Sequence, residues 1–285
     1  MVRPIPQRPK AKPAAPVAVP IAGGTLHLQE LRSRIFRNTR LLRVWLPPDY
    51  GKGGGARYPV LYLNDGQNLF EASTAFGGMH WQVGETASRL IGEKKIRPLI
   101  IVGIDNAGKN RAREYLPYKS RDPKVPIVQG TSYPNFLKRE VLPFVEGRYA
   151  VLTGSANTGL GGSSLGGLIT LYTQLASPGV FGQLLIESPS LFVANRKILA
   201  ECRKFRDWPS RIYLGMGTHE VGDAEKDEKV TNDARELASI LSAANLGNDW
   251  LKVRIEEGAT HSESAWADRL PEALEFLYPA SAPSH

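Results

Sequence analysis

The chain has 285 residues, of which 42% are hydrophobic and 22% charged, so it is long and apolar enough to form one large globular domain. Its formal net charge is +8, but four of the basic residues lie in the first 24 positions, and no basic stripe interleaved with aromatic residues follows, which argues against a nucleic-acid partner. No stretch approaches 18 consecutive apolar residues, so no membrane span is predicted, and the lack of an apolar leader run leads us to expect a cytoplasmic protein.

Residues 1–24 are rich in Pro, Ala and Val and show no periodicity, so we expect a flexible basic arm there. From residue 25 the hydrophobic pattern becomes regular, and we predict a single domain over residues 25–285. An antiparallel pair of strands is expected at 26–36 and 40–46, ended by two prolines at 47 and 48.

Apolar runs at 59–64 and 98–104 are typical of strands that are buried on both faces, and a helix is predicted between them at 80–95. Residues 105–132 form a long polar segment, and segments of this length inside a compact domain are usually functional or disordered. Further strands are predicted at 157–163, 181–187, 211–216 and 251–256, and further helices at 134–147, 165–176, 194–205, 226–246 and 264–277. Pro271 is expected to kink or restart the last helix.

This alternation of strands and helices predicts an α/β fold with an eight-stranded, mostly parallel sheet and helices on both faces. Between the strand at 157–163 and the next helix, Gly162-Ser163-Ser164-Leu165-Gly166 fits the G-x-S-x-G pattern of a nucleophile elbow. In such an elbow a sharp strand-to-helix turn exposes a serine hydroxyl, and flanking glycines avoid steric conflict. Ser164 occupies the serine position of the pattern and Ser163 does not, so Ser164 is the predicted nucleophile.

A serine nucleophile needs a histidine base and a carboxylate that orients the histidine. In this fold class the order along the chain is serine, acid, histidine. Among five histidines, His261 follows the last predicted strand and is the candidate base. Glu220, which follows the strand at 211–216, is the candidate acid, with Asp223 and Asp227 as alternatives.

The tetrahedral intermediate of acyl transfer to a serine needs two backbone N–H donors. We predict that one comes from Leu165, directly after the nucleophile, and the other from Gln67, in the loop after the strand at 59–64. No pair of histidines has the spacing of metal ligands, so no metal and no cofactor is expected.

These residues lie within a series of segments that spans residues 25–278 and matches a known family in sequence and order. The segments are Val44-Trp45-Leu46-Pro47-Pro48, residues 58–70, Gly161 to Gly167, Gly217-Thr218-His219-Glu220, and His261 with Trp266. In this order they resemble the α/β-hydrolase family often labelled "putative esterase", which includes enterochelin, feruloyl and acetyl-xylan esterases. The resemblance implies serine carboxylic-ester hydrolysis, with Ser164, His261 and Glu220 as the triad and Gln67 and Leu165 as oxyanion donors.

The substrate stays open between a siderophore trilactone, a short or aromatic acyl ester, and a feruloyl or acetyl ester of plant polysaccharide. Arg111, Arg113 and Tyr115 of the polar segment are candidate contacts for an anionic or catecholic substrate, with solvated loop residues as the alternative reading. Phe192 is a further candidate substrate contact. Close members of the family with siderophore-type or sugar-linked substrates tend to carry tryptophan near this position, so the chain departs here from the pocket that the resemblance implies. The non-enzymatic alternative is a catalytically silent binding protein on the same fold.

Overall fold

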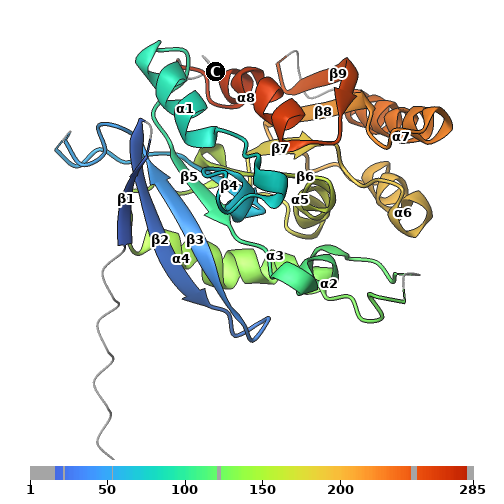
Figure 1. Ribbon diagram of the computed structural model, residues 1–285, viewed down its shortest axis with the longest axis horizontal. Helices are drawn as coiled ribbons and strands as arrows, with labels where there is room; N and C mark the ends of the chain where they lie inside the picture. Colours follow the sequence, from blue (N-terminus) through green and yellow to red (C-terminus); the bar gives the residue numbers. More distant parts are fainter. Residues whose placement is uncertain (1–16, 22, 53, 121–122, 245–248, 281–285) are drawn as a thin grey trace, which may run out of the picture.

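A central β-sheet lies between two layers of helices in this computed structural model, which describes residues 17–280 except 22, 53, 121–122 and 245–248 (Figure 1). Within those residues nine strands form one sheet, in the order β1-β2-β3-β5-β4-β6-β7-β8-β9. The strands are β1 (Val17–Ile21), β2 (Gly24–Arg32), β3 (Thr39–Leu46), β4 (Val60–Asn64), β5 (Ile100–Ile104), β6 (Thr158–Ser163), β7 (Gln183–Glu187), β8 (Arg211–His219) and β9 (Leu251–Thr260).

The sheet is antiparallel at one end and parallel over the rest. Strands β1, β2, β3 and β5 pair antiparallel in that order, whereas β5, β4 and β6 to β9 run parallel. Every residue of β4 to β7 is buried, as expected for parallel strands covered by helices on both faces. The α/β-hydrolase fold predicted from the sequence is therefore present.

The sheet differs from the prediction by one strand. The flexible arm predicted over residues 1–24 includes residues 17–21, but these form β1, which pairs with β2 at the edge of the sheet. Pro20 obscured the strand in the sequence, because proline cannot donate a ladder hydrogen bond and is tolerated mainly at an edge position such as this one. Residues 1–16 of the predicted arm lie outside the described residues.

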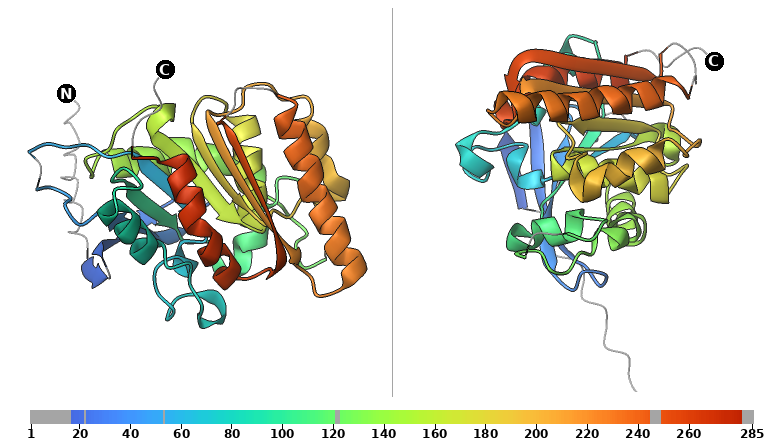
Figure 2. Two further views of the ribbon diagram at one scale, coloured as in Figure 1. Left: turned by 90° about the horizontal axis from the view of Figure 1, so that it is seen from above. Right: turned by 90° about the vertical axis from the view of Figure 1, so that its right-hand side faces the viewer.

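The helices cover the sheet unequally. Helices α1 (Val83–Gly92) and α8 (Glu263–Leu277) pack side by side on one face (Figure 2). The other face is covered by α3 (Tyr133–Phe136), α4 (Leu142–Glu146), α5 (Leu165–Ala176), α6 (Val193–Cys202) and α7 (Ala224–Ser242), and the short α2 (Arg111–Tyr115) lies near α5. Of the kink or restart expected at Pro271, the restart is absent, because α8 continues through this residue as one helix. None of the helices in the described ranges combines the length and apolarity that a membrane crossing requires.

The parallel strands place the predicted site residues at one edge of the sheet. Gln67 follows β4, Ser164 follows β6, Glu220 follows β8 and His261 follows β9. Since β4, β6, β7, β8 and β9 run in the same direction, the loops after them gather at their shared carboxyl edge.

Candidate active site

Ser164 forms the turn between β6 and α5 in a backbone conformation that non-glycine residues rarely adopt, with φ 57° and ψ −124°. Its N–H donates to the carbonyl oxygen of Glu187 at 3.0 Å, and its own carbonyl oxygen accepts from the N–H of Ser190 at 3.1 Å. These two hydrogen bonds hold the turn against the end of β7. The positive φ lies on the serine itself, and its hydroxyl lies 3.4 Å from the Ser190 hydroxyl.

The glycines of the motif allow close packing around this turn. A Cβ atom on Gly162 would lie 2.9 Å from the Cβ of Asn64 and 3.0 Å from the carbonyl carbon of Gly166. A Cβ on Gly166 would lie 3.1 Å from a carboxylate oxygen of Asp65. The contact between the elbow and the end of β4 therefore leaves no room for a side chain at Gly162 and little room at Gly166, and neither glycine has a positive φ of its own.

His261 and Glu220 meet although 41 positions separate them in the chain: Nδ1 of His261 lies 2.5 Å from Oε2 of Glu220. The other carboxylate oxygen, Oε1, accepts from the Gly217 N–H at 2.6 Å and from the Ser188 hydroxyl at 2.7 Å. Burial opposes ionisation of Glu220, but the hydrogen bonds from His261, Ser188 and Gly217 outweigh it and lower the pKa of this carboxyl. Glu220 is thus held as a carboxylate facing the imidazole.

The two alternative acids, Asp223 and Asp227, accept hydrogen bonds from backbone N–H groups at and before the start of α7. The side chain of Asp223 caps α7 by accepting the Lys226 N–H at 3.0 Å. Asp227 accepts the Val221 N–H at 2.6 Å. Of the three carboxylates left open by the sequence, Glu220 is the one that contacts His261.

Ser164 and His261 line the same cavity, whose volume is about 550 Å³. Trp266 and the exposed ring of Phe76 contribute apolar surface to its wall. The polar part of the wall comes from three loops at the carboxyl edge and includes Asp65, Gln67, Asn68, Thr74, Asn106, Arg111 and Glu263.

The two backbone N–H groups predicted as oxyanion donors lie in the first turns of helices. Leu165 is the first residue of α5, and Gln67 lies in a 3₁₀-helix (Gly66–Asn68) directly after β4. Backbone N–H groups in the first turn of a helix have no intrahelical acceptor, so they are free to bind an anionic oxygen. The side chain of Gln67 is held separately, because its Oε1 accepts the Asn106 N–H at 3.1 Å.

Among the predicted substrate contacts, Arg111 lines the cavity, but its charge is already paired. Its guanidinium makes two contacts with the Asp65 carboxylate, Nε to Oδ1 and Nη2 to Oδ2, each 2.7 Å long. Asn106 adds a third hydrogen bond to Asp65, from its Nδ2 to Oδ1 at 2.6 Å. Asp65 has a left-handed conformation with φ 58° and immediately precedes the turn that carries Gln67.

The other three predicted contacts do not belong to the described wall of this cavity. Tyr115 is fully buried, and its hydroxyl accepts the Asp65 N–H at 3.2 Å. Arg113 lines a different cavity, together with Glu114. Phe192 is 55% exposed on the surface. The polar composition of residues 105–132 suggested solvent-facing side chains, but residues 111–115 form α2, one side of which packs inward.

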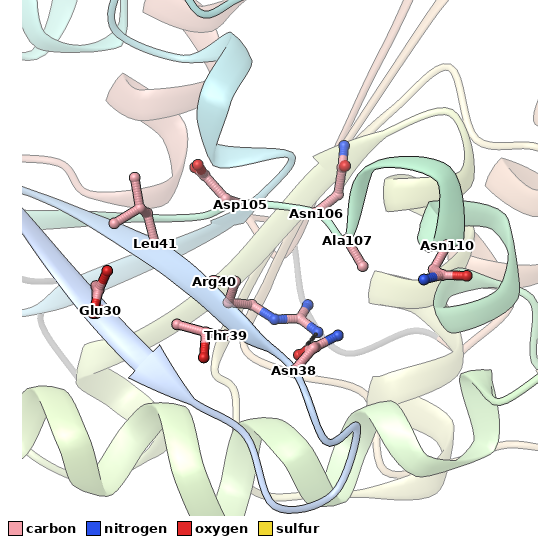
Figure 3. A pocket seen from close by; sticks show the side chains of 9 residues that line it. All are labelled: Glu30, Asn38, Thr39, Arg40, Leu41, Asp105, Asn106, Ala107 and Asn110. Atoms are coloured by element: carbon pink, nitrogen blue, oxygen red, sulfur yellow. Dashed lines mark hydrogen bonds between the residues drawn. The ribbon is translucent and has the colours of Figure 1, made fainter.

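A third cavity, of about 370 Å³, shares Asn106 with the cavity at Ser164 (Figure 3). It is lined by Arg40, whose guanidinium bonds to Asn38 at 3.0 Å and to Glu114 at 2.6 Å. The described wall of this third cavity includes none of the residues predicted for catalysis. The cavity at Ser164 is therefore the candidate active site.

Comparison with known proteins identifies a family for this chain. The model of the family described as "Putative esterase" matches residues 33–277. Among curated relatives, "Uncharacterized protein YbbA" of Bacillus subtilis (strain 168) is 23% identical over 244 residues, which cover 84% of this chain and 92% of that protein.

Two solved structures show the same fold at low sequence identity. The enterobactin esterase of Shigella flexneri has a TM-score of 0.67 at 20% identity, over 88% of this chain and 58% of that one. A ferulic acid esterase of Anaeromyces mucronatus has a TM-score of 0.65 at 19% identity, over 90% of this chain and 91% of that one.

Proposed function

This chain belongs to the "Putative esterase" family, and we propose that its carboxylic-ester hydrolase activity uses Ser164, His261 and Glu220 as a Ser-His-Glu triad. The observation that carries the proposal is the 2.5 Å contact between His261 Nδ1 and Glu220 Oε2, beside a cavity that Ser164 also lines. Because Glu220 engages Nδ1, the Nε2 atom of His261 is the nitrogen left to exchange a proton with the serine.

In the acylation step, Ser164 Oγ attacks the ester carbonyl carbon while His261 accepts the hydroxyl proton. The negative charge that develops on the carbonyl oxygen would be stabilised by the N–H groups of Gln67 and Leu165. His261 then gives the proton to the alcohol oxygen, the C–O bond breaks and the acyl group stays on Ser164. His261 then deprotonates a water molecule, which attacks the acyl carbon of the acyl-enzyme. The bond between Ser164 Oγ and the acyl carbon breaks, His261 returns its proton to Oγ, and the acid leaves.

Glu220 supports the charged intermediate of the base. Because its pKa is lowered, the carboxylate remains ionised when His261 becomes an imidazolium, and their attraction favours the proton transfer. Glu220 keeps its own negative charge throughout the cycle.

For the substrate, we propose an ester with an apolar or aromatic group that rests on Phe76. Phe76 lines the cavity and is 81% exposed. The Arg111 cation, in contrast, is paired with the Asp65 carboxylate and offers little to an anionic group. A siderophore trilactone and a short or aromatic acyl ester both fit this description, as does a feruloyl ester. An acetyl ester of xylan would have to place its sugar ring against Phe76.

The triad is tested by labelling the protein with a fluorophosphonate probe and by measuring hydrolysis of p-nitrophenyl acetate. The native protein should be labelled at Ser164 and should turn over the ester, and Ser164→Ala should lose both properties, with Ser163→Ala as the matched control. Turnover that survives in Ser164→Ala would reject the assignment. A native protein that is neither labelled nor active would favour a binding protein, and a panel of trilactone, feruloyl and acetyl esters would identify the substrate.

A further inference from the structure

Ser188, directly after β7, is a buried residue with an unusual backbone conformation. It is 2% exposed and has φ 39°, and its N–H donates to the carbonyl oxygen of Gly215 at 2.9 Å. A serine in such a conformation is held by its surroundings at an energetic cost, and residues of this kind concentrate at functional sites. Its position next to the proposed triad therefore suggests a role for its hydroxyl.

The hydroxyl of Ser188 connects helix α8 to Glu220. The indole Nε1–H of Trp266 donates to Ser188 Oγ at 2.9 Å, and Ser188 Oγ donates to Glu220 Oε1 at 2.7 Å. The direction of both bonds follows from chemistry, because an indole nitrogen can only donate and an ionised carboxylate can only accept. Trp266 thus occupies the acceptor side of the hydroxyl, and the Ser188 proton points to Glu220.

Trp266 also contacts the proposed base. Its ring meets the His261 ring edge-on, with centroids 5.0 Å apart and an interplanar angle of 86°. Ser262 is the N-cap of α8, and its side chain accepts the Ala265 N–H. His261 and Trp266 therefore occupy the positions just before the cap and four residues after it, where paired side chains fix the direction in which a chain enters a helix.

We propose that Ser188 and Trp266 are positioning residues that hold Glu220 and His261 in register for proton transfer. Glu220 Oε1 is engaged by the Ser188 hydroxyl and the Gly217 N–H, which stops the carboxylate from rotating and directs Oε2 to His261. Trp266 holds the acid through Ser188 and the base through its ring. This inference rests on the proposed triad.

Two substitutions remove the hydrogen bonds of Ser188 and Trp266 but largely keep the packing of their side chains. Ser188→Ala removes the donor to Glu220, and Trp266→Phe keeps an aromatic ring beside His261 but removes the Nε1–H. Trp81→Phe is the matched control, because Trp81 is buried and packs on Trp266 with centroids 5.6 Å apart but does not line the cavity.

The pH dependence of kcat/KM for p-nitrophenyl acetate is the discriminating measurement. In Ser188→Ala, Glu220 loses a hydrogen-bond donor and becomes a stronger acceptor for the imidazolium proton, so the midpoint of the acid limb should move to higher pH. We expect kcat to fall about tenfold, as for the loss of one hydrogen bond to a charged group, with little change in KM. Trp266→Phe should shift the acid limb in the same direction by less, and Trp81→Phe should match the native profile.

A double variant tests whether Trp266 acts through Ser188. If it does, Trp266→Phe should add little to the effect of Ser188→Ala, because two members of one hydrogen-bonded chain are not additive. Folded single variants with a native kcat and a native acid limb would overturn the inference, and if Ser188→Ala fails to fold, the profile of Trp266→Phe decides. Activity retained in Ser164→Ala would instead reject the triad itself, so the two failures are distinguishable.

Discussion

Arg111 and Asp65, which are 46 positions apart, form a two-point ion pair with both N–O distances at 2.7 Å. Asp65 immediately precedes the 3₁₀-helix that carries Gln67, and Asn106 contacts the same carboxylate. Arg111, which the sequence predicts as a substrate contact, therefore stabilises the loop that carries Gln67, a proposed oxyanion donor.

Replacing Arg111 by Gln should lower kcat for neutral p-nitrophenyl esters about tenfold with little change in KM, because the planar two-point contact that orients the loop is lost. Arg111→Lys should restore little, since an ammonium cannot reproduce the planar fork. Arg113→Gln is the matched control and should keep kcat, because Arg113 lines a different cavity. A rise in KM confined to anionic esters would show that Arg111 binds substrate directly.

The identity of the acid can be tested with two carboxylates of one loop. Glu220→Gln should reduce kcat by about 10³-fold or more, because the amide cannot stabilise the imidazolium. Asp223→Ala should keep kcat but lower the free energy of unfolding by about 1 kcal/mol, as expected for a lost N-cap. Steady-state kinetics and denaturant unfolding of both variants check this, and the reverse pattern would make Asp223 the acid.

Close packing at the elbow makes Gly162 sensitive to the smallest side chain. Gly162→Ala would press a methyl group against Asn64 and Gly166, and we expect a loss of about 1–3 kcal/mol in the free energy of unfolding together with most of the esterase activity. Gly92→Ala, at the end of α1, has open space around its Cβ and should be neutral or slightly stabilising. Equal stability of the two variants would contradict the packing argument.

The pKa of the buried Glu187 carboxyl should make the free energy of unfolding depend on pH. Burial raises the pKa of this carboxyl to about 7, although Arg269 donates two hydrogen bonds to it. A raised folded-state pKa means that the folded protein holds the proton more tightly than the unfolded chain. This contribution to stability is therefore complete below about pH 4.5 and is lost as the pH rises through 7.

Glu187→Gln stays neutral, so its Tm should fall less between pH 5 and pH 8 than the Tm of the native protein. Thermal unfolding followed by circular dichroism at several pH values measures the difference between the two slopes. Parallel Tm curves would mean that Arg269 keeps Glu187 ionised across this range.

Most of the fold could be predicted from the sequence because its signals are local. Buried parallel strands appear as continuous apolar runs, and the predicted helix at 165–176 matches α5 at both ends. The triad candidates follow from their order along the chain after these strands, because parallel strands bring the loops at their carboxyl ends together. β1 was missed because a five-residue edge strand with a proline carries little periodicity.

The sequence by itself determined the α/β architecture, Ser164 as the serine of the elbow motif and His261 as the histidine that follows the last strand. Only the tertiary structure decided that Glu220 contacts His261, that Arg111 pairs with Asp65, and that Trp266 reaches Glu220 through Ser188. The physical reason is distance along the chain. Periodicity reports which face of one element is buried, whereas a hydrogen bond between two elements depends on strand register, helix placement and side-chain direction, which are set when the layers pack together.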